Sequence, residues 1–365
     1  MNSISPSRPG NRGKSLSIAT PHPAAPQPPS PSGRGSATAT VFSSVSPKTH
    51  TPHELHRSER DWPETNCYVD LWIEILHACG YAPEAALGFT AAQDFEGDQF
   101  TFFKFPLEDL QLLFGLRVQE LSIFDSIESH ALEQVGRGRM AIVEVDGFFL
   151  PDTRGTSYRL EHTKTSIGIN RLDPAARSMD YFHNAGFHRL SGEDYDCVLG
   201  KSPSLAEGAD VLFPYVEFIK FDCGSHLPDL RESALALLRK HIAERPRDNP
   251  IAAFRSAITA HAQVVARNPP AFFHKYAFNT LRQLGANFEL LASHLRWLAE
   301  LGETGLDASR DSCLAISAGA KTFQFQLARA VSRKRFDGLE TLLDPLVDQY
   351  ERALDPLAAL YLSVG

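Results

Sequence analysis

Cys67 has a position that could give it chemistry, because it stands at the start of a predicted helix. Residues 66–80 read NCYVDLWIEILHACG, with Asn66 as a helix-capping residue type and Gly80 as a natural stop. A thiol at a helix N-terminus meets the positive end of the helix dipole and backbone N–H groups that lack intrahelical partners. Such a place lowers a thiol pKa and offers donors to an oxyanion. Cys67 is therefore a candidate nucleophile, weighed against the plainer interpretation of a small residue buried at a helix start.

A cysteine nucleophile needs a base, and His162 is the candidate, because it precedes a predicted buried strand that contains Ile167-Gly168-Ile169 and so resembles the base of cysteine enzymes with a papain-like layout. Read alone, His162 would be an ordinary strand-edge histidine. A third residue that orients the imidazole is expected at the end of the next strand. Asn184 is favoured there, and Asp180 is its competitor. Two further histidines flank Asn184, but no cysteine or carboxylate spacing matches them, so we expect no metal site.

The helices and strands predicted around these residues indicate an α+β fold up to about residue 228. One helix is followed by a sheet of consecutive strands, which is not the pattern of a wound βαβ fold. We predict helices over 67–79 and 126–135, and strands over 100–105, 118–123, 140–145, 163–170 and 178–182.

The remaining chain predicts an all-α domain, because apolar residues recur there at helical spacing. Its predicted helices are 235–243, 251–266, 270–284, 287–301, 309–331 and 339–360, with Pro246 and Pro269-Pro270 at breaks. Residues 1–55 consist mainly of Pro, Ser, Ala, Thr and Gly, and we expect them to be disordered. The predicted organisation is a tail (1–55), an α+β catalytic domain (56–228) and a helical domain (229–365).

Charge and cysteine usage limit the classes of function. The chain has a net charge of −8, and residues 1–53 hold five basic residues and no acidic one, so the rest carries −13. A body this acidic argues against a nucleic-acid groove and against an anionic membrane surface. Five widely spaced cysteines fit a reducing compartment. No run of 18 apolar residues and no secretory signal is present, so we expect a cytoplasmic protein.

Residues 62–200 resemble the papain-like cysteine fold of the bacteriocin-processing domains of peptide exporters. They are still more similar to the N-terminal domain of the butirosin-pathway acyltransferase family. The matching features are Asn66-Cys67 before a helix that ends at Gly80, the segments Leu87-Gly88-Phe89 and Phe100-Thr101-Phe102, and His162 before its strand. The chain also resembles an uncharacterised bacterial family often encoded beside amino acid:carrier-protein ligases.

This resemblance implies a papain-like domain followed by a helical domain. It also implies a cysteine-dependent acyltransferase whose catalytic triad consists of Cys67, His162 and either Asn184 or Asp180. The acyl or aminoacyl group would come from a carrier-protein thioester on a phosphopantetheine arm, pass through acyl-Cys67, and reach an amine. No bound cofactor is expected. The alternatives are a cysteine peptidase or thioesterase, and a non-catalytic carrier-protein-binding protein.

The sequence departs from the family pattern at two places. The aromatic-Gly-Asp after the histidine strand is Asn170-Arg171-Leu172-Asp173, and the upstream oxyanion glutamine is missing. The Cys67 backbone N–H and the Asn66 side chain are the alternative oxyanion donors, which suits a reactive thioester better than a peptide.

Two features of the helical half are candidates for substrate contacts. Lys321 and Gln324 follow a run of small residues (315–320) and would meet the acceptor or the pantetheine arm, against the plainer interpretation of tight helix packing. Carrier proteins are acidic, so a basic cluster is the candidate docking patch, although such a cluster is most often a solvated helix end. It consists of Arg329, Arg333, Lys334 and Arg335.

Overall fold

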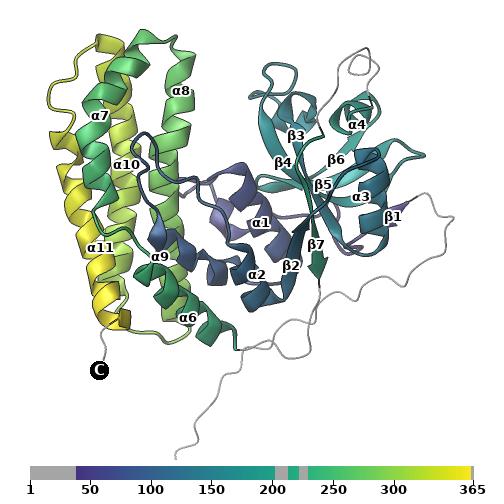
Figure 1. Ribbon diagram of the computed structural model, residues 1–365, viewed down its shortest axis with the longest axis horizontal. Coiled ribbons are helices and arrows are strands. Elements are labelled where there is room, and N and C mark those ends of the chain that lie inside the picture. Colours follow the sequence, from purple (N-terminus) through teal and green to yellow (C-terminus); the bar gives the residue numbers. More distant parts are fainter. Residues whose placement is uncertain (1–37, 202–212, 222–228, 363–365) are drawn as a thin grey trace, which may run out of the picture.

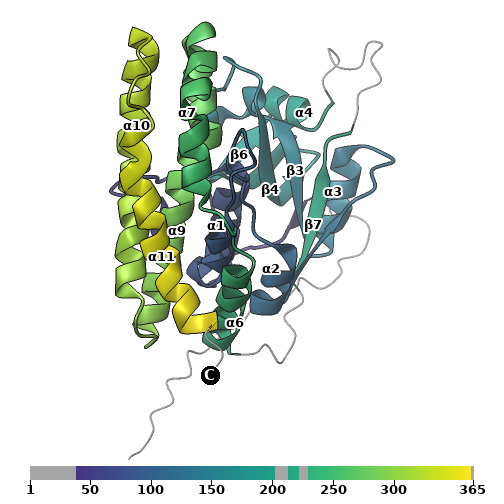
Figure 2. The same ribbon diagram turned by 60° about the vertical axis from the view of Figure 1, so that its left-hand side comes forward.

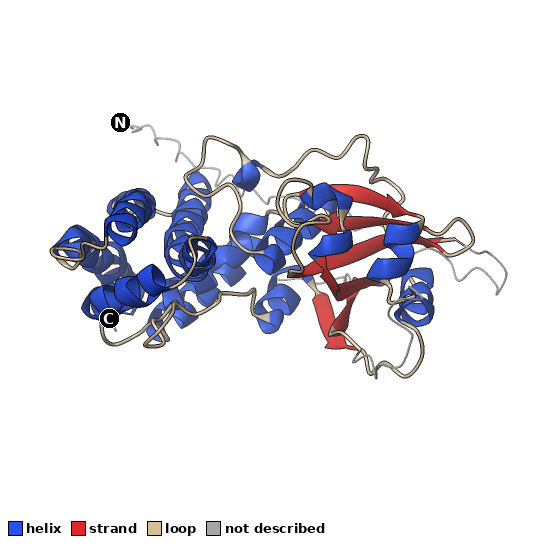
Figure 3. Cartoon of the chain, turned by 90° about the horizontal axis from the view of Figure 1, so that it is seen from above, coloured by secondary structure: helices blue, strands red, loops and turns tan. Residues whose placement is uncertain are grey.

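The chain forms an α+β structure in which an antiparallel sheet lies beside a bundle of long helices (Figure 1). The computed structural model describes residues 38–201, 213–221 and 229–362. Viewed from above, the strands gather at one end of the molecule and the long helices at the other (Figure 3). The α+β class and the C-terminal helical region agree with the sequence-based prediction.

The sheet has seven strands, and every pairing in it is antiparallel. Its order is β2-β7-β3-β4-β5-β6, with β1 paired to β4, so β7 lies between two strands that precede it in the chain. The strands are β1 (Ala39–Thr40), β2 (Leu116–Glu120), β3 (Met140–Asp146), β4 (Lys164–Asp173), β5 (Ser178–His183), β6 (Gly186–Ser191) and β7 (Val216–Phe221).

Helix α1 (Cys67–Ala78) lies between the sheet and the long helices (Figures 1 and 2). Its apolar side chains are buried, and Leu71 and Ile75 approach β4 at Gly168. A Cβ on Gly168 would lie 3.3 Å from each of these two side chains and 3.0 Å from Met140 Sδ. The glycine thus allows the helix to approach the strand closely, which fixes α1 over the sheet.

Three shorter α-helices lie in the described residues between α1 and β7. They are α2 (Leu107–Phe114), α3 (Ile127–Gly136) and α4 (Glu193–Val198). Helix α3 packs against β3 and β4. The predicted strand at 100–105 is wrong: Phe100 only bridges Phe95, because its ring is buried between Phe95 and Phe254 rather than in a sheet.

All the regular elements among the described residues of the C-terminal half are helices, joined by short connections (Figure 2). Helix α8 runs through a π-helical turn (Phe278–Arg282) directly into α9, where the sequence predicted two separate helices. The helices are α6 (Leu230–Ala243), α7 (Pro250–Arg267), α8 (Ala271–Ala277), α9 (Gln283–Glu300), α10 (Asp307–Arg333) and α11 (Asp344–Leu362). Buried apolar side chains of both halves form one continuous core.

The predicted disordered tail is too long, because residues 38–55 belong to the fold. Phe42 is buried against Phe221, and its backbone N–H donates to the Asn170 side chain at 2.8 Å. His50 hydrogen-bonds Glu74 of α1 at 2.7 Å. These few aromatic contacts outweigh a composition that by itself predicts disorder. Residues 1–37 lie outside the described part of the chain. None of the helices described is both long and apolar enough to cross a membrane.

Candidate active site

Cys67 occupies the first position of α1, as predicted, and Asn66 is the residue that fixes this start. The Asn66 Oδ1 accepts hydrogen bonds from the backbone N–H groups of Tyr68 and Val69 at 3.2 and 3.0 Å. Its Nδ2 donates to the Phe103 carbonyl at 3.0 Å, and the side chain is buried. The structure therefore uses Asn66, the predicted oxyanion donor, as a helix cap and an anchor for the 100–105 segment.

The Cys67 thiol is half-buried against the start of β4. Burial raises the pKa of this thiol, and the charge of Asp70 acts in the same direction. A hydrogen bond with the Thr165 hydroxyl and one from the Ser166 backbone N–H, together with the charge of Lys164, partly oppose this rise in pKa. The resting site therefore holds a thiol rather than a thiolate, and Cys67 needs a base to react.

This environment predicts the pH dependence of Cys67 alkylation. Since burial raises its pKa above the ordinary value of about 8.5, labelling by iodoacetamide should still accelerate between about pH 8 and about pH 10. Lys164→Ala should move the profile to higher pH, because Lys164 favours the thiolate. Peptide mapping of labelled Cys67 measures the rate, with Lys275→Ala on α8 as the control. A plateau reached below pH 8 would contradict the assignment.

A buried imidazole–carboxylate pair lies behind Thr165. The Thr165 Oγ1 is 2.8 Å from Nε2 of His183, whose Nδ1 is 2.5 Å from the Asp152 carboxylate. Both Thr165 and His183 are buried. Burial alone would raise the pKa of Asp152, but its hydrogen bonds from His183 and Tyr181 and the nearby His188 lower that pKa overall. Polar contacts thus run without a break from Cys67 through Thr165 and His183 to an ionised Asp152.

A second imidazole–carboxylate pair lies at the same end of the sheet, on its surface. The Nδ1 of His162 is 2.5 Å from the Asp146 carboxylate, and the ring stacks on Phe148 with a centroid separation of 4.4 Å. Asp146 also accepts backbone hydrogen bonds from Phe148 and Thr163. The His162 side chain is 70% exposed, and the contacts of the Cys67 thiol are with β4 instead.

The two residues predicted to orient His162 have other contacts. Asp180 forms a bidentate pair with Arg189 of β6, at 2.6 and 2.8 Å. Asn184 occupies the turn between β5 and β6 with φ of 46°, a left-handed conformation that asparagine tolerates. The structure instead gives His162 a carboxylate partner, Asp146.

A pocket of about 570 Å³ opens beside His162. Its walls are the end of β3, residues 162–164 before and at the start of β4, the start of α3, and residues 197–201 and 213–214. The Lys164 Nζ is 2.7 Å from Glu144, and the Lys201 Nζ is 2.8 Å from Glu128. Ile127, Val198 and Phe213 give the pocket apolar surface. Such a volume suits a small organic molecule.

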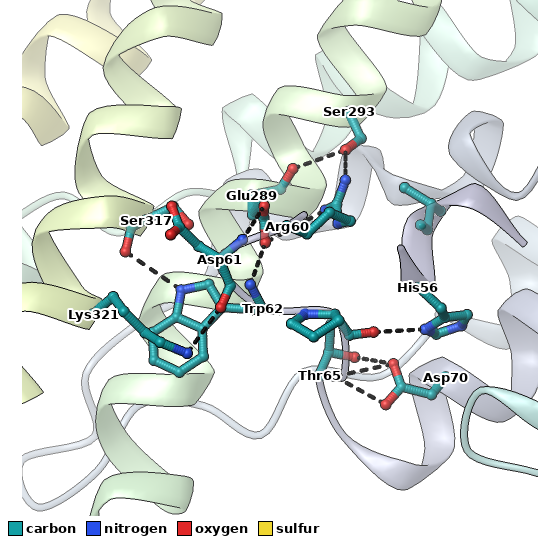
Figure 4. A network of polar contacts seen from close by, with 12 residues as sticks. His56, Arg60, Asp61, Trp62, Thr65, Asp70, Glu289, Ser293, Ser317 and Lys321 are labelled. Atoms are coloured by element: carbon teal, nitrogen blue, oxygen red, sulfur yellow. Dashed lines mark hydrogen bonds and ion pairs between the residues drawn. The ribbon is translucent and has the colours of Figure 1, made fainter. Parts of the chain in front are cut away.

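The segment that leads to Cys67 is held by the helical half of the chain (Figure 4). Glu289 of α9 accepts hydrogen bonds from the backbone N–H groups of Asp61 and Trp62, at 3.1 and 2.9 Å. The Lys321 Nζ of α10 donates to the Asp61 carbonyl at 2.9 Å and lies 4.3 Å from the centroid of the Trp62 ring. Helices α9 and α10 therefore clamp the chain five residues before Cys67.

The same segment is anchored to α1 itself at Thr65. The backbone N–H and the hydroxyl of Thr65 both donate to the buried Asp70 carboxyl, the hydroxyl at 2.6 Å (Figure 4). Burial raises the pKa of Asp70 to about 6. Lys321, predicted to meet a substrate, thus contacts the clamped segment, and Gln324 lies half-buried on the following turn of α10. The basic cluster (Arg329, Arg333, Lys334 and Arg335) is exposed at the end of α10.

Sequence reasoning missed Thr165, His183, Asp152 and Asp146. His183 could have been found as the last residue of a predicted strand. Asp152 lies in a 3-10 helix of three residues (Pro151–Thr153), and no periodic pattern in the sequence predicts that element. Among the described residues, no group of three or more His, Cys, Asp or Glu side chains is placed to hold a metal ion.

Comparison with known proteins finds two matches that together span most of the chain. Residues 51–221 match the DUF1839 N-terminal domain, and residues 228–359 match the DUF1839 C-terminal domain. No curated protein matches the chain.

Proposed function

The chain belongs to the DUF1839 family, and for this member we propose cysteine-dependent acyl transfer from a carrier-protein thioester to an amine. The observation that carries the proposal is the contact path from the half-buried Cys67 through Thr165 to the His183–Asp152 pair. A nucleophile, a proton acceptor and an orienting carboxylate in series are the parts that nucleophilic acyl transfer needs. Their placement, on a helix start and adjacent strands, supports the papain-like interpretation of the domain.

In the proposed acylation, the Cys67 sulfur attacks the carbonyl carbon of the thioester. Its proton passes to the Thr165 oxygen, while the Thr165 hydroxyl proton moves to Nε2 of His183. Asp152, which hydrogen-bonds Nδ1, stabilises the imidazolium that forms. The bond between the carbonyl carbon and the carrier sulfur then breaks, and the carrier thiolate takes the proton back along the same path. The products are acyl-Cys67 and the free carrier thiol.

Two features of the site suit a thioester donor. The helix start and the Ser166 N–H, which hydrogen-bonds the Cys67 sulfur, supply few oxyanion donors, and a thioester needs less such help than an amide. The acidic character of carrier proteins makes the exposed basic cluster at the end of α10 the proposed docking patch. Gln324 and Lys321, on the same helix, remain candidates for contacts to the pantetheine arm.

Intact-mass measurement tests the proposal directly. The wild-type protein, mixed with acyl carrier protein loaded with acetyl, octanoyl or glycyl groups, should gain the mass of one acyl group. Cys67→Ala should gain none, because the acyl group is held by the Cys67 sulfur. Cys313→Ala, which removes a buried thiol in α10, is the matched control and should gain the adduct.

The result that overturns acyl transfer is the absence of both an adduct and carrier unloading with all three donors. An adduct that water removes as fast as an added amine would indicate a hydrolase instead.

A further inference from the structure

We propose that the pocket beside His162 binds the acceptor amine, and that His162 takes the proton from that amine during transfer. The inference rests on the proposed function and deepens it. It assigns one base, His183, to the acylation of Cys67 and another, His162, to the attack of the amine on acyl-Cys67. The main observation in its support is the place of His162. Its imidazole is oriented by Asp146 and lines a pocket of about 570 Å³ at one end of the sheet.

Asp146 fixes the state in which His162 can act. The carboxylate accepts three hydrogen bonds, from His162 Nδ1 and from the backbone N–H groups of Phe148 and Thr163. A carboxylate bound to Nδ1 holds the neutral ring in the tautomer that carries its proton there. Nε2 is then a free lone pair on an exposed ring, which is the form a general base requires.

The pocket adjoins the nucleophile through β4. Thr163 and Lys164 line the pocket, and they directly precede Thr165 and Ser166, which hydrogen-bond the Cys67 sulfur. Residues spaced two apart on a strand are separated by about 7 Å. The charge of Lys164, which lines the pocket, also acts on the Cys67 thiol. An extended acceptor in the pocket can therefore reach across this short stretch of β4 to an acyl-Cys67.

The lining favours a primary amine that carries an apolar group. Asp146 and Glu144 place two carboxylates at the pocket and Lys164 and Lys201 place two ammonium groups there, so the lining is formally balanced and accommodates the neutral amine, which is the form that attacks. Each lysine is already paired with a glutamate, so neither stands as an unpaired cation beside the amine. Ile127, Val198 and Phe213 offer apolar contact to the rest of the acceptor.

The transfer step balances as follows. The neutral amine nitrogen attacks the carbonyl carbon of acyl-Cys67, and its proton passes to Nε2 of His162. The carbon–sulfur bond breaks, and Cys67 leaves as a thiolate that takes a proton from water. The products are an amide and the free Cys67 thiol, and His162 releases its proton to water.

The test measures how fast a preformed acyl-enzyme loses its acyl group to an added amine. Octanoyl-Cys67 is prepared from octanoyl carrier protein, separated from it, and treated with hexylamine or with hydroxylamine at neutral pH. His162→Ala should acquire the acyl group as the wild type does, but should react with hexylamine about 10²- to 10⁴-fold more slowly. Hydroxylamine is largely unprotonated at neutral pH and needs no base, so it should remove the acyl group from the wild type and from His162→Ala at similar rates.

Two further variants sharpen the result. Asp146→Asn should slow the hexylamine reaction in the same way, because an amide can donate to Nδ1 and so place the imidazole proton on Nε2. His274→Ala, at an exposed histidine on α8, is the matched control and should react as the wild type does. Equal hexylamine rates in the wild type and His162→Ala would overturn the inference while leaving acyl transfer intact. Failure of the wild type to form octanoyl-Cys67 would instead overturn the proposed function.

Discussion

Thr165→Val and His183→Asn should each slow the acylation of Cys67 by about 10²- to 10⁴-fold, the usual contribution of general-base catalysis. Valine matches the shape of threonine but removes the hydroxyl that joins Cys67 to His183. Asparagine at position 183 can still donate to Asp152, so the buried carboxylate keeps a partner, but it cannot accept the thiol proton. The rate of acyl-adduct formation by intact mass is the measurement.

His162→Ala is the informative comparison, because the sequence pattern predicts His162 as the base for Cys67. If Thr165→Val and His183→Asn acquire the acyl group at the wild-type rate while His162→Ala does not, the contact path through Thr165 is not the proton route. The pH profile separates catalytic from structural effects. Loss of the base should slow acylation most where Cys67 is still a thiol and least at alkaline pH, where Cys67 ionises by itself.

Trp62→Ala should lower the free energy of unfolding by about 3–5 kcal/mol, the usual cost of truncating a large buried aromatic side chain. Trp62 is buried, its Nε1 donates to the Ser317 carbonyl at 3.4 Å, and its ring lies directly on α9 at Gly285. A Cβ added at Gly285 would be 2.3 Å from Nε1 of Trp62, so Gly285→Ala should also destabilise, by about 1–3 kcal/mol. Denaturant unfolding measures both.

The double variant gives the sharper test of this contact. Once Trp62 is alanine, Gly285→Ala no longer meets the ring, and the helical preference of alanine over glycine should make it stabilising by about 0.5–1 kcal/mol. The sign of the Gly285→Ala effect thus depends on Trp62. Gly136→Ala in α3, where an added Cβ meets nothing within 4 Å, is the control and should not depend on Trp62. An unchanged sign would contradict the packing described.

The elements with a single strong pattern could be predicted from the sequence. Helix α1 and strands β3, β4 and β5 lie within one to three residues of their predicted bounds, because a cap, a buried apolar run or a turn marks each of them. Strand β7 was missed, since its place between β2 and β3 depends on pairings with residues about 75 to 105 positions away. Residues 38–55 were missed because a few aromatic contacts hold a segment of otherwise low hydrophobicity.

The residues of the candidate site also differ in how well the sequence predicts them. Cys67 could be placed because a helix start has a local signature, whereas its partners depend on how strands align. The register of β4 and β5 brings Thr165 close to His183, and no spacing in the sequence encodes that register. Asp146 ends β3 and Asp152 lies in a short 3-10 helix, and only the fold shows which histidine each of them contacts. The roles predicted for Asn184, Asp180 and Gln324 stay predictions.

The clamp on residues 60–62 has a consequence for the order in which the protein matures during synthesis. Trp62 and its hydrogen-bond partner Ser317 are 255 residues apart. At about 5–20 residues per second, a ribosome needs roughly 10–50 s to make the intervening chain. Until α9 and α10 emerge, the segment before Cys67 lacks its anchors on Glu289 and Lys321. The anchored form of the proposed site would therefore exist only in chains that have been made at least through α10.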